Sequence, residues 1–571
     1  MPRPFGAIGR GLALAAGVFV APLPLSQDAV GSVSGAVVDG RTGASVAPAI
    51  VLISPGSTNS REKKTVKVNV ESDGTFIATG IAPGRYWIRA EANGYRTGVF
   101  GQVRSKDLGS TLDVNANSAK SGLRLPVWRL GSVRGNVVGR DQRPMAGKRI
   151  RLLRQKNGAS VQPAGNATTK EDGSFEITRV PAGSYLIAVE GTSGAGIKDS
   201  AQTFFYPDAT NPRTALAVQV EDSVDNLPVE LREPDTPTHS VTGSIKSPLG
   251  QESNVDVVLE FSDGNSPIGG VPSLRTKTRP DGSFVFPAVQ NGQFVVTATV
   301  FPKWPDETIG RKASDSVAKT SRSSQPIAPL PSGATLWGHS LINISNEPVK
   351  VVVDLQPGFS ISGRLIFNGT AVPPTAAQFL SKAVHISPVG ATYSGVFPAG
   401  RVEADMTFRL AAMPEGRYML GMQAEAFPGW TIGSVLLGGK EVNGQAFALF
   451  ADVKDAVITL VDRPTSVSGR VSYSGATRPL DMAVIAFSVE QRWDEVTDLG
   501  GQVARMPLNA EMTFDLVGMP AGRYWIVAVG GKLPEDWKDT KFLRSLIPLA
   551  KSVDISPGRQ KSQSLELQII R

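Results

Sequence analysis

The sequence contains no cysteine and only three histidines in 571 residues. Without cysteine there is no disulfide, no thiolate nucleophile and no thiol for lipid attachment, so stability must come from core packing. A zinc site or a serine triad would need His239, His339 or His385, yet none of them has zinc-ligand spacing and no G-x-S-x-G elbow precedes a helix pattern. We therefore expect a protein that is not an enzyme, with no catalytic residue, metal or cofactor.

Long apolar runs are also scarce. The run "GLALAAGVFVAPLPL" follows Arg3 and Arg10, is interrupted by Pro22 and Pro24, and is shorter than the roughly 20 apolar residues of a spanning helix. It predicts an export signal at residues 1–29, with a buried strand or a membrane anchor as the alternative, and it leaves the cleavage site open. No later stretch could form a transmembrane segment, so we expect a periplasmic, outer-surface or secreted protein.

Glycine and proline are abundant, at 60 and 41 residues, while 41% of residues are hydrophobic and 19% are charged. This composition is typical of a globular protein with many tight turns and few long helices. At about 100–200 residues per domain, the length predicts about three to six domains. The fold class that we expect is all-β.

One short phrase, of which "DGSFEITRVPAGSY" is an example, occurs five times. Two rings always stand ten residues apart, a spacing that lets both point into one core. The ring pairs are Phe76 and Tyr86, Phe175 and Tyr185, Phe284 and Phe294, Phe408 and Tyr418, and Phe514 and Tyr524. A glycine stands two places before each second ring and indicates a turn with positive φ. Asp-Gly precedes the first ring in three copies and predicts a hairpin.

A second phrase opens each repeat, and a third closes it. The opening phrase has alternating apolar residues around Gly35, Gly135, Gly243, Gly363 and Gly469, which predicts an edge or bulged strand approached closely by another backbone. The closing phrase, such as "LRLPVWRL", alternates like a strand. Repeats of about 100–120 residues predict five immunoglobulin-size β-sandwich modules in tandem. The predicted boundaries are 30–128, 129–235, 236–357, 358–463 and 464–571.

The second repeat resembles the carboxypeptidase regulatory-like domain. It matches the family pattern at Gly135, Pro144, Asp172, Gly173, Phe175, Pro181, Gly183 and Tyr185. The later repeats depart from it, with Met406 and Met512 in place of glycine and with Gln290 or Asn291 in place of proline. The resemblance implies a transthyretin-like sandwich of the kind that occurs in exported bacterial arrays. Such sandwiches are grouped with starch-binding modules, so carbohydrate binding is also implied.

Charged residues indicate surface roles. The turns "ESDG", "KEDG" and "RPDG" supply one or two carboxylates each, too few for a calcium loop, so we interpret them as turn chemistry. The net charge is +8, and the cluster from Lys148 to Lys156 predicts a solvated strand face, with attraction to an anionic surface as the alternative. Nucleic acid is disfavoured as a partner, because the basic residues form no stripe interleaved with aromatic residues.

Aromatic residues in connecting segments are the candidate binding residues for a sugar or a partner protein, although they could instead lock neighbouring domains together. They are Phe204, Phe205, Tyr206, Trp304, Trp337, Trp430, Trp493 and Trp537. Trp87 and Trp525 follow a repeat tyrosine, so strand alternation turns them toward solvent or a neighbouring module. Residues 301–343 form the longest irregular stretch and are predicted to be an insert in the third module.

These features predict an exported, non-enzymatic scaffold or adhesion-type protein, built as a rod of five modules, that holds a protein partner through loops and inter-domain faces. The alternative is polysaccharide binding through exposed loop aromatics. The identity of the ligand, the oligomeric state and the relative orientation of the modules do not follow from the sequence.

Overall fold

The computed structural model describes residues 30–55, 65–105, 107, 109–155, 161–191, 202–224, 228–250, 252–264, 267–301, 335–374, 383–389, 400–422, 430–463, 465–475, 479, 482–489, 503–508, 511–531, 533–534 and 537–570. The regular secondary structure of the described chain is almost all β strand, as predicted. Its helical segments are α3 (Thr540–Leu546) and the 3₁₀ turn η3 (Ile547–Leu549). Within these ranges, no helix is long and apolar enough to cross a membrane. The expected export signal lies outside them.

The first sandwich has a four-stranded sheet ordered β4-β1-β9-β6 and a second sheet ordered β3-β2-β5-β7, with β8 paired to β5. Strand β1 pairs antiparallel with β4 and parallel with β9, while β2 and β5 pair antiparallel in the opposite layer. The strands are β1 (Gly31–Asp39), β2 (Ala49–Pro55), β3 (Val66–Asn69), β4 (Thr75–Ile81), β5 (Gly84–Ala92), β6 (Tyr95–Arg96), β7 (Gly98–Val99), β8 (Thr111–Val114) and β9 (Ala119–Arg129).

The same pairing recurs four more times along the chain, and the strands around each recurrence are called the second to fifth sandwiches below. The second sandwich contains β10 (Gly131–Val138), β11 (Arg149–Gln155), β12 (Val161–Thr168), β13 (Ser174–Val180), β14 (Gly183–Val189), β15 (Phe204–Phe205), β16 (Val218–Val220) and β17 (Val229–Arg232). The third contains β18 (Thr238–Lys246), β19 (Asp256–Phe261), β20 (Leu274–Lys277), β21 (Ser283–Gln290), β22 (Gly292–Val300), β23 (Leu336–Ile344), β24 (Val349–Asp354) and β25 (Gln356–Pro357).

In the fourth and fifth sandwiches, strand pairing joins the two layers. The fourth contains β26 (Phe359–Asn368), β27 (Ala383–Pro388), β28 (Gly400–Val402), β29 (Thr407–Met413), β30 (Gly416–Met422), β31 (Thr431–Leu437), β32 (Lys440–Glu441), β33 (Phe447–Leu449) and β34 (Val453–Val461). The fifth contains β35 (Ser466–Ser472), β36 (Met482–Ser488), β37 (Val503–Pro507), β38 (Thr513–Val517), β39 (Gly522–Gly531), β40 (Lys551–Ile555), β41 (Gln560–Ser562) and β42 (Leu565–Ile570). Strand β23 occupies part of the predicted insert 301–343, so the prediction of an irregular segment there is wrong for residues 336–343.

The glycine of each opening strand lies opposite the first ring of the repeated phrase. In the first sandwich this pair is Gly35 and Phe76, and the other four sandwiches have the same register. A Cβ on Gly35 would lie 2.1 Å from the carbonyl oxygen of Leu123 on the parallel strand, so only glycine fits. The predicted close approach is confirmed, and the pairing register shifts between Val33 and Gly35, in agreement with the bulged alternative, but the strand is central in its sheet and is not an edge strand.

The repeated phrase connects the two layers. The first ring is on β4 of one sheet and the second is on β5 of the other. The Asp-Gly turn before the first ring lies between β3 and β4, which also belong to different sheets, so the prediction of a hairpin is wrong for the first sandwich. The Asp-Gly turn before the first ring is held by its aspartate, because Asp73 accepts hydrogen bonds from the backbone N–H and hydroxyl of Thr75 at 2.9 and 2.7 Å. These bonds lower the pKa of Asp73 below its ordinary value. The carboxylate therefore fixes the turn.

Methionine replaces the turn glycine in the last two sandwiches without changing the backbone. Met406 and Met512 have φ values of 68° and 57°, close to the 75° of Gly173 and Gly282. A left-handed backbone is costly for a side chain with a Cβ. Met512 offsets this cost in part because its side chain is buried in the core of the fifth sandwich.

Both rings of each phrase are buried in the same core, as predicted. Where the second ring is tyrosine, its hydroxyl donates a hydrogen bond to the carbonyl four residues earlier, as Tyr185 does to Pro181 at 2.6 Å. Equivalent bonds are made by Tyr86, Tyr418 and Tyr524. Gly183, which lies between Pro181 and Tyr185 in the sequence, has a φ of 159°. The motif thus anchors the connection to the core.

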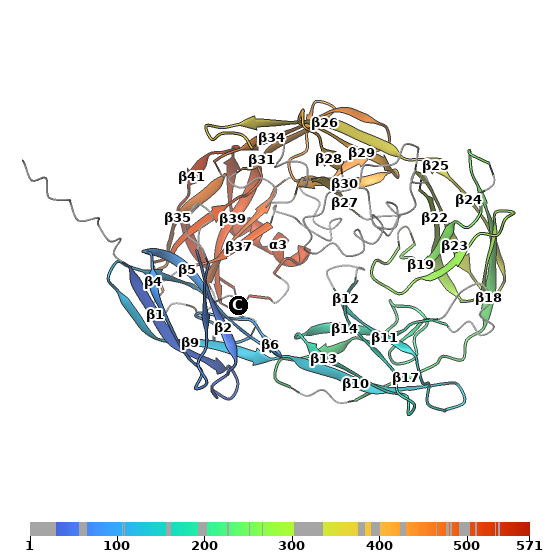
Figure 1. The fold of residues 1–571 in the computed structure, drawn as a ribbon, viewed down its shortest axis with the longest axis horizontal. Helices are drawn as coiled ribbons and strands as arrows, with labels where there is room; N and C mark the ends of the chain where they lie inside the picture. The colour runs from blue at the N-terminus through green and yellow to red at the C-terminus, as the bar shows by residue number, and fades with distance from the viewer. Residues whose placement is uncertain are drawn as a thin grey trace, which may run out of the picture.

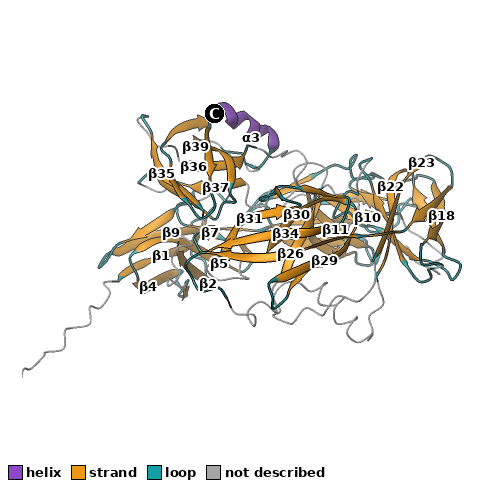
Figure 2. Cartoon of the chain, turned by 90° about the horizontal axis from the view of Figure 1, so that it is seen from above, coloured by secondary structure: helices purple, strands orange, loops and turns teal. Residues whose placement is uncertain are grey.

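The sandwiches follow a curved path that returns on itself. In Figure 1 the red C-terminal sandwich lies beside the blue N-terminal one. Figure 2 shows β35, β36 and β39 raised above the layer that contains the other sandwiches, close to β1 and β9. The chain is therefore a closed array, whereas the sequence left open how the modules of the predicted rod are oriented.

Gly363→Ala tests the close approach in the fourth sandwich. A Cβ at this position would lie 1.9 Å from the carbonyl oxygen of Ala456, so we expect the substitution to lower the free energy of unfolding by about 1–3 kcal/mol. Denaturant unfolding followed by fluorescence measures this loss. Gly269→Ala is the control, because a Cβ added there would have no atom within 4 Å. Equal effects of the two substitutions would contradict the account.

Candidate binding cavity between the first and last sandwiches

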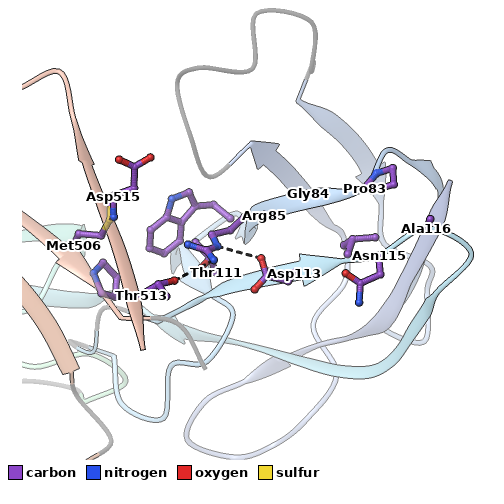
Figure 3. Close-up of a pocket in the computed structure, with 13 residues that line it drawn as sticks. Pro83, Gly84, Arg85, Thr111, Asp113, Asn115, Ala116, Met506, Thr513 and Asp515 are labelled. Atoms are coloured by element: carbon purple, nitrogen blue, oxygen red, sulfur yellow. Dashed lines mark hydrogen bonds and ion pairs between the residues drawn. The ribbon is translucent and has the colours of Figure 1, made fainter. Parts of the chain in front are cut away.

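A cavity of about 490 Å³ lies between the first and fifth sandwiches (Figure 3). From the first sandwich it is lined by the start of β5 and by β8, and from the fifth by β37 and β38. The lining residues are Pro83, Gly84, Arg85, Trp87, Thr111, Asp113, Val114, Asn115, Ala116, Met506, Pro507, Thr513 and Asp515. Its walls are therefore built by parts of the chain that are far apart in sequence.

Arg85 connects the two walls. It lies opposite Asp113 in the register of β5 and β8, and its Nε forms an ion pair with Asp113 Oδ1 at 3.1 Å. Its Nη2 donates a hydrogen bond to Thr513 Oγ1 at 3.3 Å, across 428 positions of sequence. Both partners of the ion pair are about one-third exposed, so the pair is partly open to a ligand or solvent.

Asp515 adds a second carboxylate to the cavity. Its backbone N–H donates to Met506 Sδ at 3.3 Å, which ties β38 to β37. Burial raises the pKa of Asp515, and the nearby charge of Arg85 opposes this shift. The ionised carboxylate is thus poorly solvated and only partly compensated.

The adjacent rings Phe204 and Phe205 are both buried, but in different cores. Phe204 belongs to the core of the second sandwich, whereas Phe205 belongs to that of the third and meets Phe261 edge-on with 5.7 Å between ring centroids. Strand β14 is shared in the same way, because Leu186 and Ala188 also pack into the third core. This arrangement matches the domain-locking alternative for Phe205.

The third sandwich also contacts the second through a residue that departs from the family pattern. Gln290 is 1% exposed, and its Nε2 donates to the carbonyl oxygens of Thr203 and Thr210 at 2.8 and 3.4 Å. At this point of the repeat the other sandwiches have proline nearby. Gln290 therefore provides hydrogen bonds between sandwiches where proline could provide none.

Of the remaining candidate aromatics, those that the structure describes are not brought together. Trp337 lies on β23 and Trp430 precedes β31, and both are 6% exposed. Tyr206 is half-buried, and Trp537 is half-buried with Arg505 and Lys538 at 5.6 and 5.5 Å from its ring centroid. Trp304 and Trp493 lie outside the described residues. A binding role for these eight aromatics stays a prediction.

Trp87 lines the cavity, although it was not among the candidates. The pentapeptide GRYWI occurs twice, at 84–88 and 522–526, and places Trp87 and Trp525 at the same repeat position. Trp87 faces the neighbouring fifth sandwich, whereas Trp525 packs on the second core of its own sandwich, which α3 helps to form. Sequence alone could not distinguish them, because the difference depends on closure of the array.

The predicted basic strand and the histidines form no shared site. Arg149 and Arg151 on β11 both pair with Glu190, at 3.5 and 3.3 Å. His239 and His339 lie on strands of opposite sheets in the third sandwich, and His385 lies in the fourth. Among the residues that the structure describes, no group of three potential metal ligands is present.

Residues 32–117, which form most of the first sandwich, match the model of the carboxypeptidase regulatory-like domain. The sequence motif had indicated the same family from the second repeat. No curated protein matches the chain.

Several solved structures of bacterial proteins, two of them pilins, show a weak likeness. The Bacillus anthracis TIE protein is 14% identical over 72% of this chain and 68% of its own, with a TM-score of 0.14. A minor pilin of Streptococcus agalactiae is 15% identical over 36% of this chain and 97% of its own, with a TM-score of 0.22. The major pilin subunit of Bacillus cereus is 10% identical over 58% of this chain and 100% of its own, with a TM-score of 0.14. Scores this low carry no argument about function.

A double-mutant cycle tests whether Phe205 locks the second sandwich to the third. We expect Phe205→Ala and Phe261→Ala to show a coupling of about 0.5–1.5 kcal/mol in the free energy of unfolding, as for an aromatic pair. Phe204→Ala with Phe261→Ala is the matched control, since Phe204 is equally buried but lies in the other core. Its expected coupling is near zero. The same coupling in both cycles would show that the cores are not divided in this way.

Proposed function

We propose that this chain is an exported, non-enzymatic scaffold that holds a protein partner through its loops and inter-domain faces. The division that we propose is a signal at 1–29 and modules at 30–128, 129–235, 236–357, 358–463 and 464–571. Periplasmic, outer-surface or secreted localisation is part of the proposal. An anionic surface could add a weak attraction through the net charge of +8.

The apolar core shared by the second and third sandwiches carries this proposal. Flexibly linked modules would each bury a separate core, whereas here Leu153, Leu186 and Phe205 of one sandwich are buried in the core of the next. At the first junction, Arg96 pairs with Asp222 at 3.3 Å, and the Asp222 side chain is only 2% exposed. Such junctions favour fixed relative positions, which a scaffold needs to present separated surfaces together.

Polysaccharide binding through the predicted loop aromatics has less support. A sugar platform requires an exposed ring face. Phe204, Phe205, Trp337 and Trp430 are buried, and cations lie near the ring of Trp537. For Trp304 and Trp493 this role stays a prediction.

Site-specific photo-crosslinking in cells that naturally produce the protein tests the proposed function. Phe450 is 65% exposed and suits replacement by p-benzoylphenylalanine, with buried Phe204 as the matched control position. We expect a discrete protein adduct from exposed positions such as Phe450 and Ile77, and mature protein that lacks the N-terminal segment. Protein that keeps Met1 inside the cell, or exposed positions that give no adduct, would overturn the proposal.

A further inference from the structure

The cavity between the first and fifth sandwiches combines an aromatic ring with hydrogen-bond donors and acceptors from both of its walls. Arg85 provides only donors, Asp113 and Asp515 provide acceptors when ionised, and Thr111 and Asn115 can do both. Trp87 adds apolar surface. A volume of about 490 Å³ lies within the range of small-molecule sites.

The charges of the lining narrow the class of ligand. Two carboxylates against one guanidinium leave the cavity with an excess of negative charge, which disfavours anions. An organic cation would meet Arg85 at the centre of the site and would compete with it for Asp113, its partner at 3.1 Å. A neutral ligand is not repelled by the negative charge of the cavity and does not compete with Arg85 for Asp113.

We propose that this cavity binds a short neutral saccharide that contacts the first and the fifth sandwiches together. Each sugar hydroxyl can accept from Arg85 and donate to Asp113, so it fits beside an existing ion pair without breaking it. The apolar face of a sugar ring packs on the indole of Trp87. This site is independent of the proposed protein partner and of the eight predicted aromatics.

The fifth sandwich contains a natural comparison for this site. Arg523 and Asp554 occupy the same repeat positions as Arg85 and Asp113 and form the same ion pair, at 3.0 Å. The neighbouring Trp525 packs on the core beside α3 and lines no described cavity of this kind. The motif alone therefore does not make the site, which also needs Thr513 and Asp515 from the opposing sandwich.

Isothermal titration of the full chain with neutral trisaccharides tests the proposal. The probes are maltotriose, cellotriose, xylotriose and mannotriose, each at low and at moderate salt. We expect at least one to bind with an affinity that salt does not weaken, because the ligand is uncharged. Asp113→Asn should weaken this binding about tenfold or more, since it removes hydrogen bonds to a charged acceptor.

Asp554→Asn is the matched control and should leave the affinity unchanged. In a thermal-shift assay, the bound trisaccharide should raise the melting temperature of the wild-type protein but not that of Trp87→Ala, a comparison that needs no equal starting stability. Absence of binding by all four probes would overturn the proposal. So would binding that salt abolishes, or equal losses from Asp113→Asn and Asp554→Asn.

Discussion

The structure depends on the burial of two rings that enter the same core from different strands of the repeated phrase. Phe76 and Tyr86 illustrate the arrangement, since they lie on different layers and are 1% and 2% exposed. The residue opposite the first ring has to be glycine, because the neighbouring parallel strand leaves no room for a Cβ. The second ring is tied by its hydroxyl to the connection that joins the layers. The repeated phrase is therefore the element that holds each sandwich closed.

Closure of the whole array depends on the outward faces of the same strands. The inward residues of β14 fill the second core, and Leu186 and Ala188 on the opposite face fill the third. In β39, Val527 and Val529 face a second core that includes α3. The outward residues of β5 face neither a shared core nor a helix, and Arg85 and Trp87 instead meet the fifth sandwich across a cavity. The same strand position thus serves three different contacts.

Much of the local structure could be predicted, because it depends on residues near one another in sequence. The ring spacing, the turn glycines and the opening glycines specified the strands and the buried rings. Which strands pair with the two strands of the repeated phrase could not be predicted in this way. A strand that crosses to the other sheet and a strand that forms a hairpin have the same alternation of apolar residues. Likewise, Phe204 and Phe205 look alike in sequence, and only the packed neighbour decides which core receives each ring. The sequence left open whether Trp87 faces solvent or a neighbouring module for the same reason, since the residues of the fifth sandwich that line the cavity with it lie more than 400 positions away.

The most direct test of the account is a distance measurement between the first and last sandwiches. The chain has no cysteine, so Ile77→Cys with Ile569→Cys gives two unique spin-label sites, at residues that are 69% and 47% exposed. Double electron–electron resonance on the full chain should show one narrow distance population that matches the closed array. A broad distribution reaching much longer distances would show that the sandwiches form an open, flexible string, and would contradict both the closure and the cavity built on it.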